Sequence, residues 1–86
     1  MSADDPSALF FRGVYMITYS LVETAPGQWS VLRANFKLFD DLKLGPAIHL
    51  ARAVAREEHT RAGRGVCVEM LGGGSTIRLA HYLPSA

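Results

Sequence analysis

The sequence predicts a small α+β domain in which one helix packs on a four-stranded, mainly antiparallel sheet. Apolar and polar residues alternate with a period of two over about 14–23 and 29–39, which is typical of strands. Strong helix formers fill 46–62, and two further strand-like segments follow at 66–71 and 76–83. The predicted element order is β-β-α-β-β, because a central helix across one face of the sheet closes the core most simply.

Turn residues separate these elements. The run Ala25-Pro26-Gly27-Gln28 predicts a turn between the first two strands, since proline fixes φ and glycine accepts positive φ. Gly45 can cap the helix, with Pro46 at its first position, and Gly63 offers a left-handed stop. The glycines of 72–74 predict the tip of a second hairpin.

Length and composition define a single domain. The 86 residues suffice for one domain over 9–86, preceded by a disordered tail over 1–8 that has no apolar pattern to dock. The formal charge is +1, so no strong overall field steers a charged partner. The single cysteine, Cys67, favours a reducing, cytoplasmic setting, and we expect neither export nor membrane insertion.

The predicted helix has two distinct sides. One side is small and apolar and is expected to face the sheet, with these members: Ala47, Ile48, Ala51, Val54, Ala55 and Ala62. The adjoining flank carries His49, Arg52, Arg56 and His59, within about 80° of one another on a helical wheel. This flank is either a solvated face whose arginine stems cover apolar surface, or a contact site for nucleic acid or a protein partner.

Glu58 falls on the alanine side, where a buried carboxylate would be costly unless it were paired. Our prediction is that the helix overruns the sheet there, which leaves Glu58 in water and within reach of Arg61. The alternative is an acid placed deliberately as a functional group.

Residues that could carry chemistry do not form a known pattern. The spacing of His49, His59 and His81 matches no metal site, and Cys67 has only His81, on the neighbouring strand, as a nearby base. The glycine-rich run lacks the lysine and the following helix of a phosphate-binding loop. We therefore predict no enzymatic activity, no catalytic residue, no metal and no cofactor. An enzyme using Glu58, His59 or Cys67 in a cleft is the weakest alternative.

Large apolar residues occupy both faces of the first two strands, although one helix covers only one face. Trp29 and Val31, with Tyr15 and Tyr19, are either core residues or platforms on which bases stack. Either polar residues dominate the second face or another chain covers it, so we predict self-association as a homodimer.

Short motifs resemble those of a known family. They are Gly27-Gln28-Trp29-Ser30-Val31, then Ala47-Ile48, then Ala51-Arg52-Ala53-Val54-Ala55-Arg56, and Gly74 before a short last strand. Over about 15–79 the chain resembles small bacterial proteins grouped as domain-of-unknown-function family 2188. The resemblance implies a fold and a bacterial cytoplasmic origin, and it carries no activity.

The sequence therefore predicts a small bacterial protein that is a non-enzymatic accessory or protein-interaction module. The alternative function is weak nucleic-acid binding through the basic helix flank, with help from Arg33, Lys37 and Arg78.

Overall fold

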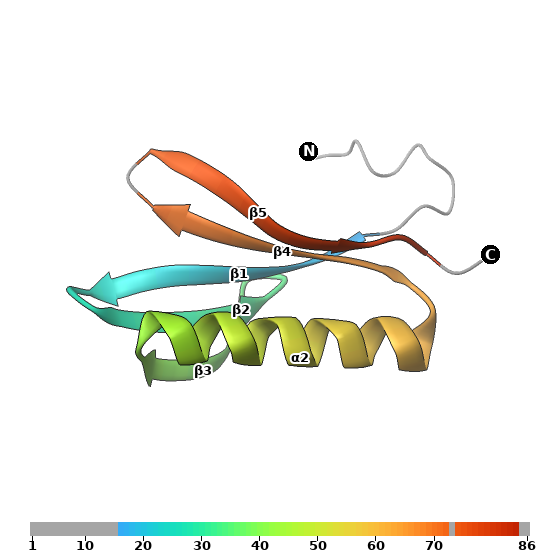
Figure 1. The fold of residues 1–86 in the computed structure, drawn as a ribbon, viewed down its shortest axis with the longest axis horizontal. Helices are drawn as coiled ribbons and strands as arrows, with labels where there is room; N and C mark the ends of the chain where they lie inside the picture. The colour runs from blue at the N-terminus through green and yellow to red at the C-terminus, as the bar shows by residue number, and fades with distance from the viewer. Residues whose placement is uncertain (1–15, 73, 85–86) are drawn as a thin grey trace.

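The computed structural model describes residues 16–72 and 74–84. In chain order the elements are β1 (Met16–Ala25), β2 (Gln28–Arg33), β3 (Phe36–Leu42), α2 (Leu44–Ala62), β4 (Gly65–Gly72) and β5 (Ser75–Tyr82). All strands join one sheet in the order β3-β2-β1-β4-β5, and α2 runs along one face of it (Figure 1). The prediction of an α+β domain with one helix on a sheet is confirmed.

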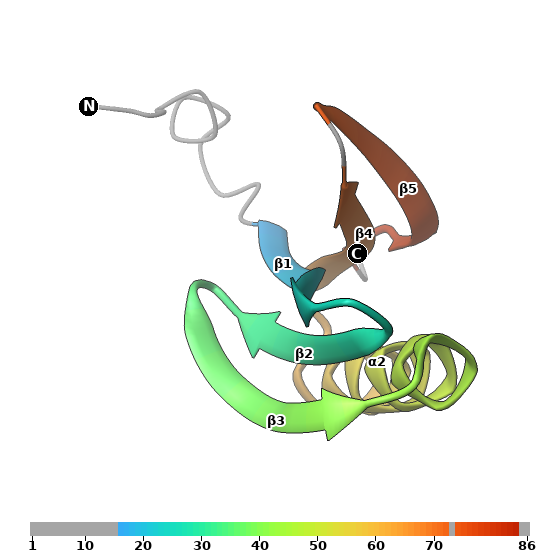
Figure 2. The same ribbon diagram turned by 90° about the vertical axis from the view of Figure 1, so that its left-hand side faces the viewer.

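The sheet is mixed. β1 pairs antiparallel with β2, β2 with β3, and β4 with β5, whereas β1 and β4 at the centre are parallel. The parallel pair follows from α2, which returns the chain to the sheet so that β4 begins at the same end as β1. The sheet curls, so that the end of β3 comes back to the start of α2 while the β4–β5 hairpin extends away from the helix (Figures 1 and 2).

The prediction of four strands is wrong, because the segment predicted as one strand over 29–39 is two. A two-residue turn at Ala34 and Asn35 divides it, with positive φ of 49° and 72° at these residues. Two successive positive φ values match the twist of an antiparallel hairpin and make the tight turn that joins β2 to β3. The other predicted turns are confirmed, since β1 and β2 flank Pro26-Gly27 and β4 pairs with β5 across 72–74.

The helix ends where the sequence predicts and begins earlier. Gly63 has φ 73°, and its N–H donates to the carbonyl of His59 at 2.8 Å, which is a left-handed stop. At the other end α2 starts at Leu44, with Lys43 at the cap position and no side-chain cap. Gly45 and Pro46 therefore lie inside the first turn. The prediction that Gly45 caps the helix and that Pro46 is its first residue is wrong.

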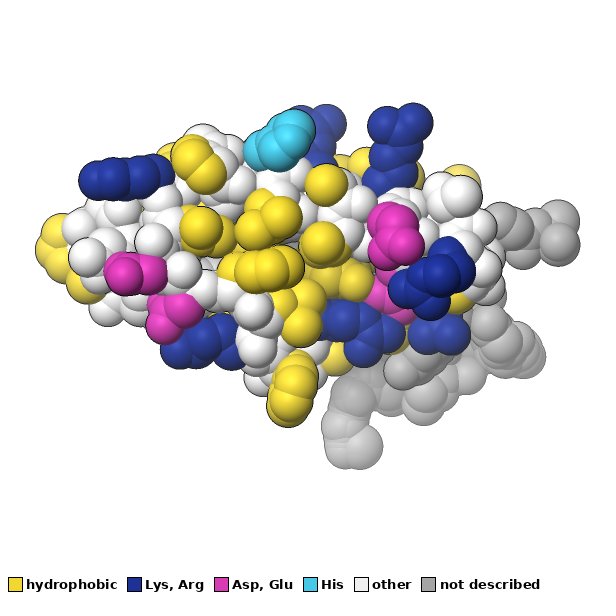
Figure 3. All heavy atoms as spheres, turned by 90° about the horizontal axis from the view of Figure 1, so that it is seen from below, with side chains coloured by type: hydrophobic (Ala, Val, Ile, Leu, Met, Phe, Trp, Pro, Cys, Tyr) yellow, Lys and Arg dark blue, Asp and Glu magenta, His cyan; other side chains and the backbone are white. Residues whose placement is uncertain are grey.

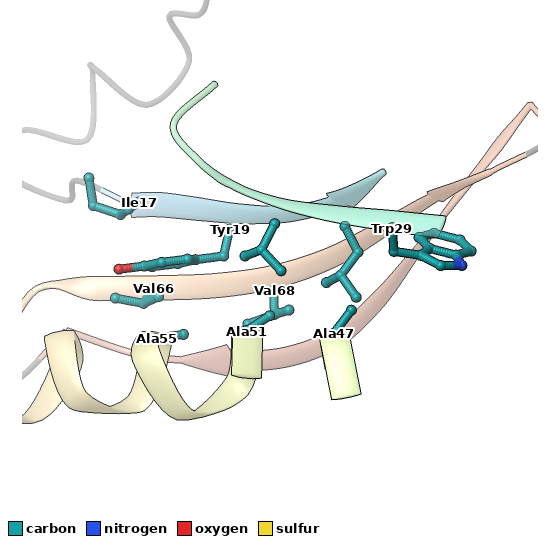
Figure 4. Packing of buried hydrophobic residues seen from close by; sticks show 10 residues of the cluster. Ile17, Tyr19, Trp29, Ala47, Ala51, Ala55, Val66 and Val68 are labelled. Atoms are coloured by element: carbon teal, nitrogen blue, oxygen red, sulfur yellow. The ribbon is translucent and has the colours of Figure 1, made fainter. Parts of the chain in front are cut away.

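The core lies between α2 and the sheet (Figure 4). Ala47, Ala51 and Ala55 are fully buried, so the small side chains bring the helix close to the strands. The strands supply the bulk, with these buried residues: Ile17, Tyr19, Leu21, Trp29, Val31, Val66 and Val68. The predicted alanine face is thus confirmed, except that Ala62 is exposed at the end of the helix.

Trp29 and Tyr19 are core residues, which excludes the alternative of exposed stacking platforms at these positions. Tyr15 and the tail predicted over 1–8 lie outside the described residues. Within those residues, no helix is long and apolar enough to cross a membrane.

Candidate interaction surfaces and a buried ionic cluster

Glu58 lies at the centre of a buried hydrogen-bonded cluster. The Tyr19 hydroxyl of β1 donates to its Oε1, and the Arg33 guanidinium of β2 donates to both oxygens, from Nε at 2.9 Å and from Nη2 at 2.7 Å. Arg64, just after the helix, donates from Nη1 to Oε2 at 3.4 Å. The carboxylate therefore ties α2 to two strands and to the segment that leads into β4.

These contacts fix the protonation states in the cluster. The hydrogen bonds from Arg33 lower the pKa of Glu58 to about 2, against the opposing effect of burial. Burial, and then the hydrogen bond to Glu58, raise the pKa of Tyr19 to about 12. Near neutral pH the cluster thus holds one carboxylate anion whose acceptor sites are occupied, which makes Glu58 a poor proton donor or acceptor.

The prediction that Glu58 lies in water beside Arg61 is wrong. Glu58 is only 3% exposed, while Arg61 pairs with Glu57 at 3.6 Å on the surface. The helix does not overrun the sheet at this point, because the curled β2 brings Arg33 against its last turns. Two arginines and a tyrosine then compensate the buried charge.

Three residues of the predicted basic flank do come together. His49, Arg52 and Arg56 are exposed on α2 and, with Ala53 and Tyr82, line a pocket of about 240 Å³. Tyr82, which sequence reasoning missed, is the last residue of β5, where the strand passes the helix. In Figure 3, which looks onto α2, histidine and basic side chains line the upper edge of the molecule.

His59, the fourth predicted residue, is used differently. Its Nε2 donates to the carbonyl of Leu83 at 2.7 Å, and its ring stacks on Tyr82 with centroids 5.6 Å apart and 30° between the planes. His59 therefore holds the end of β5 against the helix and keeps Tyr82 beside the pocket.

The other basic residues proposed for nucleic acid do not join this flank. Arg33 belongs to the buried cluster, and Lys37 pairs with Asp40 at 3.1 Å on β3. A hydrogen bond from Ser30, aided by Lys37, keeps the pKa of Asp40 below its usual value. Arg78 is paired in register with Glu69, on the sheet face away from α2.

The flank of α2 opposite the basic residues carries apolar side chains and lies on the β2–β3 side of the sheet (Figure 2). Leu50 and Val54 are half-buried there, and at about 100° per residue they lie across the alanine stripe from Arg52 and Arg56. On β3, Phe36 is 74% exposed, Leu38 is 39% exposed and Phe39 is half-buried. We call these five residues the apolar surface, and Figure 3 shows hydrophobic side chains gathered over the middle of this side.

Cys67 does not form a catalytic centre with the other candidates. Its thiol is buried 3.4 Å from the Thr18 hydroxyl, on the sheet face away from α2, whereas Glu58 lies on the helix side. His81 is its register partner on β5, as predicted, but is exposed. Within 16–72 and 74–84, no three His, Cys, Asp or Glu side chains group as a metal site would require.

Together the fold and these surfaces define a small α+β domain in which the helix α2 separates an apolar surface from a basic pocket. Searches of family models, of curated proteins and of solved structures find no match for the chain. The resemblance to domain-of-unknown-function family 2188 stays a prediction.

Proposed function

We propose that this chain is a non-enzymatic protein-interaction module that self-associates through its apolar surface. The observation that carries the proposal is the exposure of Phe36, which leaves 74% of an aromatic residue in water on the same strand as Leu38 and Phe39. Contiguous exposed apolar surface rimmed by polar residues is typical of protein interfaces, and aromatic residues contribute most to their affinity.

The charges around the apolar surface support a second copy of the chain as the partner. Both signs are present, since Glu57 and Arg61 lie on the same flank of α2, and Lys37 and Asp40 lie on β3. Figure 3 shows basic and acidic side chains at both ends of the hydrophobic area. In a two-fold interface each patch meets its own copy, so a rim with both signs can pair acid with base across it.

The state of the titratable groups supports a function without catalysis. Near neutral pH Glu58 is an anion whose oxygens already accept hydrogen bonds from Tyr19, Arg33 and Arg64, and the Cys67 thiol is buried in the middle of a strand. His59 is bonded to the main chain. A nucleophile or general base needs an accessible group with a partner that activates it, and none of these three meets that need. A single unpaired cysteine supports a cytoplasmic setting for this module.

Solution mass tests the proposal. We expect light scattering or sedimentation equilibrium to give a mass that rises toward twice the 9.4 kDa chain as concentration increases through the micromolar range. Phe36→Ser should keep the protein monomeric over the same range. Ile77→Ser is the matched control, because Ile77 is also an exposed apolar residue, at 50%, but lies on the opposite edge strand.

A monomeric mass for the wild type at several hundred micromolar would contradict self-association. If Ile77→Ser abolished association while Phe36→Ser did not, association would be real but through another surface.

A further inference from the structure

The arginines of the basic pocket differ from those cations of the domain that are paired with a carboxylate. Arg33, Lys37, Arg61 and Arg64 each lie within 4.0 Å of a carboxylate. Among the described residues, Arg52 and Arg56 have no such partner, and neither have Lys43 and Arg78, which lie outside the pocket. Both acidic residues of α2 are engaged elsewhere, since Glu57 pairs with Arg61 and Glu58 is buried. The pocket therefore presents two uncompensated guanidinium groups, one helical turn apart, to any anion that enters.

An aromatic ring completes the pocket. Tyr82 lies across from Arg52 and Arg56, and His59 fixes it by stacking on it and by holding the adjacent Leu83 carbonyl. Because the ring is already positioned, a ligand would not have to order it on binding. Guanidinium groups suit phosphate, and a preset aromatic ring suits the face of a base.

From this geometry we infer that the pocket between α2 and β5 binds single-stranded nucleic acid, a function separate from the proposed self-association. Arg52 and Arg56 contact successive backbone phosphates, and His49 extends the polar wall. Tyr82 stacks on one base. No base-edge contact is required, so binding is tolerant of sequence.

The shape of the pocket favours a single strand over a duplex or a free nucleotide. Its volume of about 240 Å³ lies below the roughly 300–1,000 Å³ of pockets that enclose a small molecule, so it accommodates one unit of a longer ligand. In a duplex the base faces are already stacked and closed to Tyr82. In addition, the end of β5 lies beside the basic flank of α2, with Tyr82 next to the arginines. The strand therefore keeps this flank of the helix from entering a major groove.

Fluorescence anisotropy with a labelled 15-nucleotide mixed-sequence DNA strand tests the inference. Two phosphate contacts predict that affinity falls roughly fifteenfold between 20 and 150 mM salt. The double variant Arg52→Gln, Arg56→Gln should lose roughly tenfold or more in affinity at low salt. Tyr82→Leu should lose at least about fivefold, whereas Tyr82→Phe, which keeps the stacking ring, should bind as the wild type does.

The matched control is the double variant Arg61→Gln, Arg78→Gln. It removes the same charge from two exposed arginines outside the pocket, so it should leave affinity within about twofold of the wild type. If the two double variants lost affinity for the strand equally, the loss would be explained by net charge alone. That result would overturn the assignment of the pocket as the binding site. Undetectable binding of the strand by the wild type at 20 mM salt, or a mononucleotide or duplex that binds as tightly, would overturn the single-strand ligand. Arg52 and Arg56 are exposed, so their replacement should leave the fold intact. The arginine variant therefore tests the site even if Tyr82→Leu disturbs the packing around the half-buried Tyr82.

Discussion

Glu58 is a charged residue inside a domain with a small core, and an unpaired carboxylate there would cost several kcal/mol. Its hydrogen bonds to Tyr19, Arg33 and Arg64 offset that cost. Replacing the whole cluster by apolar residues could be neutral for stability, so its value lies in fixing where the helix end sits on the sheet. Breaking only one partner is different, because it leaves the other charge buried.

Acid is therefore expected to destabilise the fold through Glu58. The folded pKa of about 2 lies below the reference value of 4.5, so the contribution is fully present above about pH 4.5 and is lost as pH falls toward 2. The loss is on the order of 3 kcal/mol. Urea unfolding at several pH values between 7 and 2 measures it. Glu58→Gln should be less stable at pH 7 and should lack most of this acid dependence, while an unchanged pH profile would contradict the assignment.

Removing one partner should be far more costly than removing a surface ion pair. Arg33→Gln should lower the free energy of unfolding by about 3 kcal/mol, because it leaves the carboxylate underpaired. Arg61→Gln breaks the exposed pair with Glu57 and should cost less than about 0.5 kcal/mol. Chemical denaturation of both variants gives the comparison, and similar losses would mean that Glu58 is solvated.

Tyr19→Phe isolates the hydroxyl of the same cluster. It keeps the buried ring and removes one hydrogen bond to a charged acceptor, for an expected cost of about 1.5–3 kcal/mol. The pKa of Glu58 should rise as well, because this bond is one of those that lower it. Carboxyl NMR titration of the variant would show that rise, and a Glu58 pKa that does not move would exclude the hydroxyl as a partner.

The burial of Glu58 was beyond the reach of sequence reasoning. Its partners Tyr19 and Arg33 are 39 and 25 residues away along the chain, and only the curl of the sheet brings them together. The wheel position on the alanine face was the correct signal. What misled the prediction was the nearer Arg61, because local pairs are visible in a sequence and long-range pairs are not.

At the level of elements, the β2–β3 turn shows why one strand was predicted in place of two. Alternation of apolar residues continues through Leu32, Ala34, Phe36 and Leu38, so the period of two hides the break. The turn lacks an Asn-Gly or Asp-Gly pair and relies on Ala34 and Asn35 at positive φ. Asn35 was the one local signal, since asparagine tolerates this conformation better than other non-glycine residues.

Because Ala34 has a positive φ, a glycine at this position should stabilise the turn between β2 and β3. Ala34→Gly removes a left-handed strain of about 1–2 kcal/mol, partly offset by the backbone entropy of glycine. We expect a net gain of about 0.5–1 kcal/mol in the free energy of unfolding, measured by denaturation. The Ala34 N–H bond to the Thr18 carbonyl at 2.9 Å is kept in the variant. A loss of stability would mean that the turn has a different conformation.

The helix and the last two strands were predictable because their signals are local. Strong helix formers end at a glycine, and triple glycine separates two apolar segments. The parallel pairing of β1 with β4 has no local signal and follows from strand order. Likewise the basic flank was predictable from helix periodicity, whereas its partner Tyr82 was not, because it comes from another element.

Across the whole molecule, the two flanks of α2 differ in chemistry and face different parts of the sheet. The apolar flank lies on the β2–β3 side, and the basic flank faces β5, at opposite edges of the sheet. The buried cluster supports the first surface, since Arg33 is the register partner of Phe36. Arg33→Gln is therefore expected to weaken self-association as well as stability.

An amide NMR dilution series of the isotope-labelled protein tests self-association through the apolar surface most directly. On dilution from about 1 mM to 20 μM we predict concentration-dependent shifts at Phe36, Leu38, Leu50 and Val54, with Arg52, Arg56 and Tyr82 unchanged. Linewidths should narrow over the same series toward those of a single 9.4 kDa chain. Spectra identical at every concentration with monomer linewidths, or shifts confined to the face of β1 and β4 away from the helix, would contradict the proposal.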